Sequence, residues 1–271
     1  MSDFTFGGSS LHYNCTGSGK RVLWVFHGFG QTLRNMDVLV QQLSEQFTVY
    51  SFDLFFHGQS VWGHKENLLS KLHWKELLET FLTQEKIDKF SVLGFSMGGK
   101  FALATLESFP ERIEELILIA PDGVKTNFWY SLATYPSWAK KAFRGVVIRP
   151  RRFQQLALWM RRLRVVDKGV VRFAQSQMNT REKRHRVYFS WMVFKELAFD
   201  MNHMAELIKQ YQIGVSMFIG KYDKIITEHN MRPFLQKIPD HTFIILESGH
   251  NRLVEAVAEH YTKGFSVHKS R

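Results

Sequence analysis

Short, mostly apolar runs separated by polar segments dominate the chain. The clearest runs cover residues 22–26, 90–93, 215–219 and 242–246. Their length and their content of β-branched and aromatic residues predict buried strands. Residues 100–109 are helix-like instead. A predicted strand therefore lies before residues 94–99, and a predicted helix lies after them.

Residues 94–99 read Gly-Phe-Ser-Met-Gly-Gly, which contains the motif G-x-S-x-G. Between a strand and a helix, this motif is typical of a nucleophile elbow, a tight turn that exposes the hydroxyl of its serine. Positions 94 and 98 are glycine because a Cβ atom there would collide with the neighbouring strand or helix. The start of the helix favours negative charge that develops nearby. Ser96 is therefore the candidate nucleophile.

Three further polar groups follow predicted strands. Asp223 lies just past the strand at 215–219, and His250 lies past the strand at 242–246. The strand at 22–26 ends in His27-Gly28-Phe29-Gly30, an H-G-x-G loop. Ligand sites of open parallel sheets collect at the carboxyl ends of the strands. We therefore expect Asp223 and His250 to lie near Ser96, in the chain order serine, acid, histidine.

With these motifs, nearly the whole chain resembles the α/β-hydrolase fold superfamily of serine hydrolases with a helical cap. The resemblance implies an α/β fold, a mostly parallel sheet of about eight strands flanked by helices. Residues 53–60 resemble the family loop D-x-x-G-x-G-x-S but depart from it at His57, where a glycine is common, and Ala120-Pro121 also fits the family. The resemblance places a hairpin at residues 4–14 and strands near residues 21–27, 47–53, 90–95, 115–120, 214–219 and 241–246.

Composition is compatible with one such domain and an insertion. The chain has 271 residues, of which 45% are hydrophobic, and a single cysteine, Cys15, so it can form no intrachain disulfide. The N-terminus lacks the basic and apolar regions of a signal peptide, no apolar run is long enough to span a membrane, and no Cys/His spacing is typical of a metal site. We expect a cytoplasmic protein without cofactor, metal or transmembrane segment.

Charge is distributed unevenly. Residues 124–213, where this family inserts its cap, hold 18 Lys and Arg but only 5 Asp and Glu, whereas the rest of the chain has a net charge of −2. The segment therefore accounts for the whole positive excess of the chain, whose net charge is +11. Leu156, Trp159, Met160 and Leu163 have helical spacing within it. We expect a helical cap at 124–213 over a core formed by residues 1–123 and 214–271.

The basic surface has several explanations that the sequence leaves open. The three explanations are solubility alone, attraction of an anionic substrate, and weak contact with an anionic membrane surface. No recognition motif accompanies the charge, so we expect no nucleic-acid partner. Oligomeric state is also open.

The resemblance implies a role for each candidate residue. Ser96 would attack an acyl group, His250 would accept its proton, and Asp223 would orient the imidazole. The backbone N–H groups of Phe29 and Met97 would form the oxyanion hole. Asp122, just past the sixth strand, is the alternative acid. We expect His27 to be a structural hydrogen-bonding residue of the oxyanion loop, His57 and His64 to be loop residues, and Asp53 to order its own loop.

These roles predict a serine hydrolase that acts through an acyl-enzyme on a small-molecule acyl substrate, with small to medium carboxylic esters as the favoured class. Two alternatives stay open. The elbow is also similar to those of carbon–carbon bond hydrolases and of the menaquinone-pathway synthase, a lyase, which would suit an anionic substrate. A non-catalytic ligand-binding protein on the same fold is the other alternative.

Overall fold

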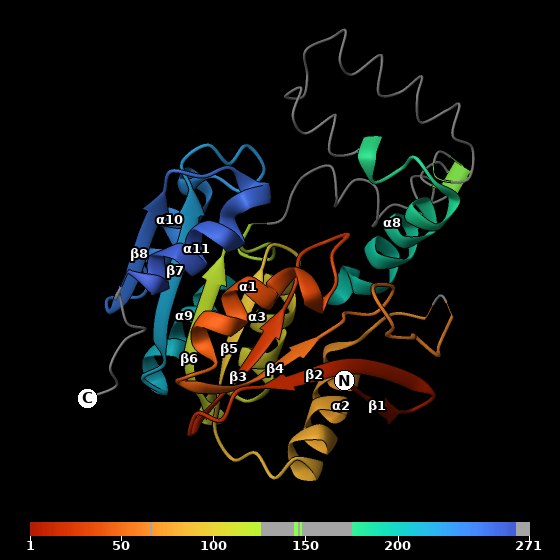
Figure 1. The fold of residues 1–271 in the computed structure, drawn as a ribbon, viewed down its shortest axis with the longest axis horizontal. Coiled ribbons are helices and arrows are strands. Elements are labelled where there is room, and N and C mark those ends of the chain that lie inside the picture. Colours follow the sequence, from red (N-terminus) through yellow and green to blue (C-terminus); the bar gives the residue numbers. More distant parts are fainter. Residues whose placement is uncertain (66, 126–143, 146, 148–174, 264–271) are drawn as a thin grey trace, which may run out of the picture. The chain divides into compact units, whose positions relative to one another are not determined.

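A single sheet forms the centre of the computed structural model, which describes residues 1–65, 67–125, 144–145, 147 and 175–263 (Figure 1). Its strands lie in the order β1-β2-β4-β3-β5-β6-β7-β8. The pairs β1/β2 and β2/β4 are antiparallel, and every other pair is parallel. The strands are β1 (Ser2–Phe6), β2 (Ser9–Thr16), β3 (Arg21–Phe26), β4 (Phe47–Phe52), β5 (Phe90–Phe95), β6 (Ile113–Ile119), β7 (Gly214–Gly220) and β8 (His241–Leu246).

The predicted fold class is confirmed, and each predicted strand is present within two residues of its expected position. The hairpin expected at residues 4–14 is β1 and β2. The sequence predicts the parallel strands well because strands buried on both faces appear as continuous apolar runs. All six residues of β5, for example, are buried.

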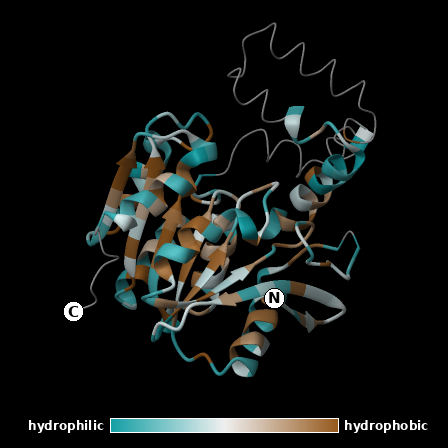
Figure 2. Cartoon of the chain, in the orientation of Figure 1, coloured by the Kyte–Doolittle hydropathy of each residue, from teal (hydrophilic) through white to brown (hydrophobic). Residues whose placement is uncertain are grey.

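Helices cover both faces of the sheet. The described helices are α1 (Asp37–Leu43), α2 (Lys71–Gln84), α3 (Gly98–Ser108), α8 (Arg181–Val193), α9 (Met201–Gln210), α10 (Glu228–Leu235) and α11 (Leu253–Thr262). Figure 2 shows the parallel strands of the sheet as largely hydrophobic, whereas the N-terminal hairpin and the helices carry hydrophilic residues as well. This difference is expected, because a helix buries one stripe while a central strand buries both faces.

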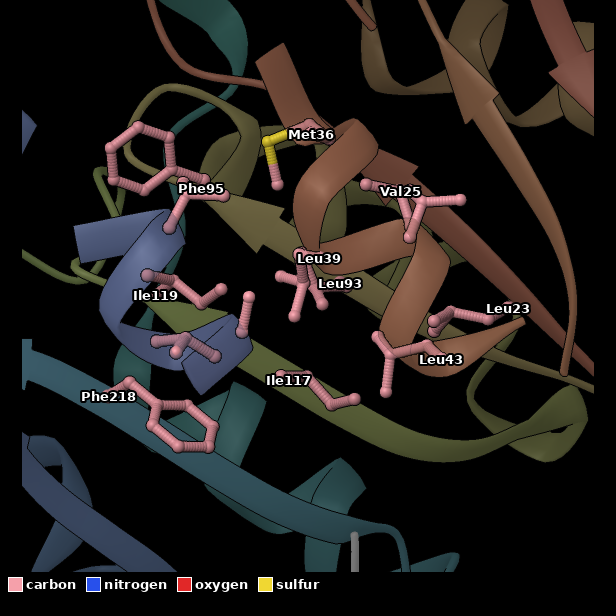
Figure 3. Close-up of a cluster of buried hydrophobic side chains, with 14 of the residues drawn as sticks. Leu23, Val25, Met36, Leu39, Leu43, Leu93, Phe95, Ile117, Ile119 and Phe218 are labelled. Atoms are coloured by element: carbon pink, nitrogen blue, oxygen red, sulfur yellow. The ribbon is translucent and has the colours of Figure 1, made fainter. Parts of the chain in front are cut away.

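Alternate residues of β3 pack on opposite faces of the sheet. Leu23 and Val25 belong to a core cluster with residues of α1 and α11 (Figure 3). Trp24 and Phe26 point to the other face, where the ring of Phe26 lies 5.8 Å from that of Trp74 on α2. Side chains of a strand alternate in this way because its period is two residues. The two hydrophobic layers hold the sheet and fix the loops at its carboxyl edge.

The chain divides into two compact units. One comprises Met1–Lys65, Leu69–Lys125 and Leu197–Arg271, and the other comprises Glu66–Leu68 and Thr126–Glu196. The expected boundary at residue 213 differs from this division, because α9 lies against α3 and belongs to the first unit. The second unit includes α8, whose first turn is capped by the Thr180 hydroxyl.

Much of the predicted cap lies outside the described residues, including Leu156, Trp159, Met160 and Leu163. Its placement over the site stays a prediction. Across the described ranges, no helix combines the length and apolar character needed to cross a membrane.

Candidate active site

Ser96 occupies a sharp turn between β5 and α3. Its φ of 50° lies in the left-handed region, which is unusual for a residue other than glycine. The Ser96 N–H donates to the carbonyl of Ile119 at 2.9 Å, and the Ser96 carbonyl accepts from the N–H groups of Gly99 and Asp122, both at 2.8 Å. These three hydrogen bonds hold the strained backbone in place.

The glycines at 94 and 98 are required by close backbone approach, as the sequence predicts. A Cβ atom on Gly94 would lie 2.5 Å from the carbonyl oxygen of Gly98. A Cβ atom on Gly98 would lie 2.1 Å from the carbonyl oxygen of Phe26, at the end of β3. Both contacts are shorter than any side chain tolerates, so α3 can begin this close to β3 and β5 only with glycine at these positions.

The structure brings Ser96, Asp223 and His250 together from three separate loops. His250 Nε2 lies 3.0 Å from Ser96 Oγ, and His250 Nδ1 lies 2.6 Å from Asp223 Oδ2. Asp223 is 4% exposed, and its Oδ1 atom accepts the N–H groups of Ile225 at 2.7 Å and Ile226 at 3.0 Å. The buried carboxylate is therefore fully hydrogen-bonded and fixed in orientation.

Asp122, the alternative acid, has a different partner. Its Oδ2 atom lies 3.3 Å from Nζ of Lys100 on α3, and its Oδ1 atom accepts the Gly123 N–H at 2.8 Å. Lys100 is 6% exposed. The geometry therefore favours Asp223 over Asp122 as the carboxylate that orients His250.

The loop after β3 presents the Phe29 N–H. His27 Nδ1 donates to the Gly28 carbonyl at 2.7 Å, and His27 Nε2 accepts the Leu54 N–H at 3.0 Å. The Gly28 carbonyl and the Phe29 N–H belong to one peptide unit and point in opposite directions. In the described part of the chain, neither the Phe29 nor the Met97 N–H donates a hydrogen bond. Both donors are therefore available to a ligand oxygen.

Gln31 is a site residue that the sequence analysis missed. Its Oε1 atom accepts the Gly28 N–H at 3.0 Å, and its own N–H donates to the Gly28 carbonyl at 3.3 Å. The turn between them contains Gly30, whose φ of 77° suits glycine. Only the place of Gln31 directly after the H-G-x-G motif could have drawn attention to it.

Asp53 orders its own loop, as expected. Its Oδ1 atom accepts the Leu33 N–H at 2.7 Å, and its Oδ2 atom accepts the Gln59 N–H at 2.9 Å. The departure from the family loop pattern, however, falls at Phe56 and not at His57. Phe56 has a φ of 66°, the left-handed conformation in which glycine carries no steric cost.

Among the described residues, no group of three or more His, Cys, Asp and Glu side chains is arranged to hold a metal ion. The site therefore consists of a hydroxyl, an imidazole and a carboxylate in line, with two N–H donors that no described residue engages. This arrangement is suited to deprotonating a serine and stabilising an oxyanion beside it.

Comparison with known proteins identifies the family. Residues 21–257 match the sequence profile of the α/β hydrolase fold family, so the chain belongs to this family. Structures that are similar include an enol-lactonase from Burkholderia xenovorans, with a TM-score of 0.69 and 18% identity over 97% of each chain. An esterase from Thermogutta terrifontis has a TM-score of 0.66 and 20% identity over 94% of this chain and 92% of its own.

Curated relatives match only part of the chain. An uncharacterized protein of Mycobacterium tuberculosis is 28% identical over 134 residues, 49% of this chain and 38% of its own length. A pimeloyl-[acyl-carrier protein] methyl ester esterase of Nitrosomonas europaea is 29% identical over 123 residues, 45% of this chain and 46% of its own. The matches thus cover less than half of these relatives.

Proposed function

We propose that the protein is a serine hydrolase that cleaves small to medium carboxylic esters through an acyl-enzyme. The observation that supports this most is the hydrogen-bonded line from Asp223 through His250 to Ser96. With Nδ1–H donated to the buried carboxylate, the Nε2 lone pair of His250 faces the serine hydroxyl. Such an imidazole is ready to take the serine proton.

In the proposed reaction, Ser96 Oγ attacks the carbonyl carbon of the ester while its proton moves to His250 Nε2. The negative charge on the carbonyl oxygen is stabilised by the N–H groups of Phe29 and Met97. Collapse of the tetrahedral intermediate expels the alcohol, which takes the proton from His250. Water then attacks the acyl-enzyme in the same way, with His250 again as the base, and releases the acid.

Two features support an electrostatic role for the elbow itself. The N-terminus of α3 begins at Gly98, two residues after Ser96, so its dipole favours negative charge beside the nucleophile. Each oxyanion donor is typically worth about 3–4 kcal/mol in the transition state. Both effects act on the tetrahedral intermediate more strongly than on a neutral ester, as catalysis requires.

A fluorophosphonate probe tests the nucleophile directly, because it phosphonylates only an activated serine. We expect the intact protein to be labelled at Ser96, as mapped by peptide mass spectrometry, and heat-unfolded protein to remain unlabelled. Labelling at another serine would show that the nucleophile is misassigned. A folded protein that is not labelled at all would favour the non-catalytic alternative.

A substrate panel tests the class of reaction. p-Nitrophenyl esters of increasing acyl length should be hydrolysed with kcat/KM highest among the short and medium chains. Anionic diketone-type acids, run beside them, test the carbon–carbon hydrolase alternative. Higher kcat/KM for the acids than for every ester would overturn the ester assignment while leaving the Ser96 mechanism intact.

A further inference from the structure

Two histidines outside the candidate active site, His64 and His73, lie close to each other beside the turn of the N-terminal hairpin. His64 lies on the loop after β4, and His73 lies in the first turn of α2. Their ring centroids are 5.0 Å apart at an interplanar angle of 82°. The indole of Trp62 packs against both, at 4.8 Å from His64 and 5.4 Å from His73. The two imidazoles are therefore held in a fixed, largely apolar setting.

Both imidazoles carry an unsatisfied nitrogen. The Nε2 atoms of His64 and His73 are buried and have no hydrogen-bond partner within the described residues. A buried polar atom without a partner is costly, and native structures leave few of them. Six buried side-chain atoms in the described part of the chain lack a hydrogen-bond partner, and these two lie on neighbouring rings, where one ligand would satisfy both.

Gly7, in the turn between β1 and β2, leaves a space between the two rings. A Cβ atom built on Gly7 would lie 3.4 Å from Cε1 of His73, 3.6 Å from Nε2 of His64 and 3.8 Å from Cε1 of His64. These are ordinary van der Waals distances, so a methyl-sized group fits there without displacing either ring. The Nε2–Cε1 edge of His64 and the Cε1 atom of His73 thus border one small space.

We propose that His64 and His73 form a binding site for a divalent transition-metal cation, with Zn²⁺ as the representative ion. Neutral imidazole nitrogen is a good ligand for Zn²⁺, Cu²⁺ and Ni²⁺ and a poor one for Mg²⁺ and Ca²⁺. Two imidazoles bound to one Zn²⁺ at Zn–N distances of about 2.0–2.1 Å and a tetrahedral angle have centroids about 5 Å apart. The observed centroid separation of 5.0 Å is compatible with this arrangement.

The surroundings define what else the site supplies. The described residues provide no group of three metal-ligating side chains, so any further ligand of the cation would come from solvent.

A bound cation would connect three segments that are distant in sequence: the loop after β4 and the start of α2 directly, and the hairpin turn at Gly7 by packing. Its effect is on stability and not on the reaction, because binding to the folded state alone shifts the unfolding equilibrium. The proposed metal site is independent of the proposed hydrolase function. If no metal binds there, the hydrolase proposal is unaffected.

The test uses full-length protein with a tag that contains no histidine, stripped of metal with a chelator. Zn²⁺ and Ni²⁺ are titrated by calorimetry, and thermal unfolding is recorded with and without metal. We expect one saturable site per chain and a rise in Tm on adding either ion. Mg²⁺ at the same concentration should have no effect. If water fills the space and metal does not displace it, Tm stays constant and the proposal is wrong.

Three variants locate the site. His64→Gln and His73→Gln should each weaken binding at least tenfold and abolish the Tm rise. His203→Gln, the same change at an exposed position of another helix, α9, should bind like the wild type. Binding that is equal in all three overturns the assignment. If a variant fails to fold, X-ray absorption of the wild type carrying one equivalent of Zn²⁺ decides: two imidazole nitrogens support the site, and a shell without them refutes it.

Discussion

Gln31 Oε1 accepts the Gly28 N–H at 3.0 Å, so one side chain holds the residue that precedes the Phe29 N–H. Together with His27, which binds the Gly28 carbonyl at 2.7 Å, it fixes the peptide that carries this proposed oxyanion donor. The two interactions act on opposite ends of Gly28. The direction of the Phe29 N–H is thus set before any ligand arrives, which is how preorganised donors lower a barrier.

Gln31→Met should lower kcat about fivefold and leave KM nearly unchanged, because losing one neutral hydrogen bond costs about 1 kcal/mol and here loosens a donor used in the transition state. The variant keeps the size of the side chain but removes the acceptor. Steady-state kinetics on a p-nitrophenyl ester measures the effect. Gln84→Met, on an exposed position of α2, is the matched control. Wild-type kcat in Gln31→Met would show that Gln31 does not position the loop.

Ser96→Ala should reduce ester hydrolysis by several orders of magnitude. The change removes the proposed nucleophile and its contact with His250 Nε2, yet the three backbone hydrogen bonds of residue 96 remain. The fold should therefore persist, with an unchanged circular-dichroism spectrum and a Tm within a few degrees of the wild type. Retained hydrolysis in folded Ser96→Ala protein would rule out this serine as the nucleophile.

The variants Asp223→Asn and Asp122→Asn should differ sharply in kcat. The amide at position 223 favours the wrong tautomer of His250, so kcat should fall by about 10³–10⁴-fold. Asp122→Asn weakens a pairing with Lys100 that lies apart from the imidazole, and kcat should fall less than about tenfold. Parallel kinetics on the two purified variants make the comparison. The reverse ranking would place the functional acid after β6.

Much of the fold follows from the sequence because strands buried on both faces carry continuous apolar runs, as β5 and β7 do. The order of Ser96, Asp223 and His250 at strand ends likewise predicts their convergence at one edge of the sheet. Side-chain contacts within loops leave no such pattern. Nothing in the sequence indicates that Lys100 pairs with Asp122 or that Gln31 folds back onto Gly28.

The position of α9 could not be predicted from the sequence either, for a different reason. Its apolar stripe, which includes Met204 and Ile208, predicts a helix but not the surface on which it packs. Because α9 packs with the core, the last segment of the first unit begins at Leu197 and not at Gly214, where the sequence analysis placed it. Phe56 differs from these cases: counted from Asp53, the first glycine of the pattern D-x-x-G-x-G-x-S falls on Phe56, so the pattern marks the left-handed position although the residue type does not.

A buried carboxyl group lies near the start of β6, away from the carboxyl edge that carries Ser96. Glu115 is 2% exposed, its Oε2 atom lies 3.2 Å from Arg21 Nη2, and its Oε1 atom accepts the Ser216 hydroxyl at 3.4 Å. Burial raises the pKa of Glu115 to about 7, although Arg21 opposes the shift. The folded state therefore binds a proton that the unfolded chain, with a pKa near 4.5, has already released.

Because the folded state holds more protons between these two pKa values, this group makes the protein less stable as pH rises from about 4.5 to 7, and the loss is complete above pH 7. Glu115→Gln removes the titration. The free energy of unfolding of the variant, relative to wild type, should therefore rise by about 3 kcal/mol across this window. Urea unfolding at several pH values measures it. Glu111→Gln, the same change at an exposed position just before β6, is the control and should follow the wild-type curve. A pH dependence in Glu115→Gln identical to wild type would show that Glu115 does not titrate in this range.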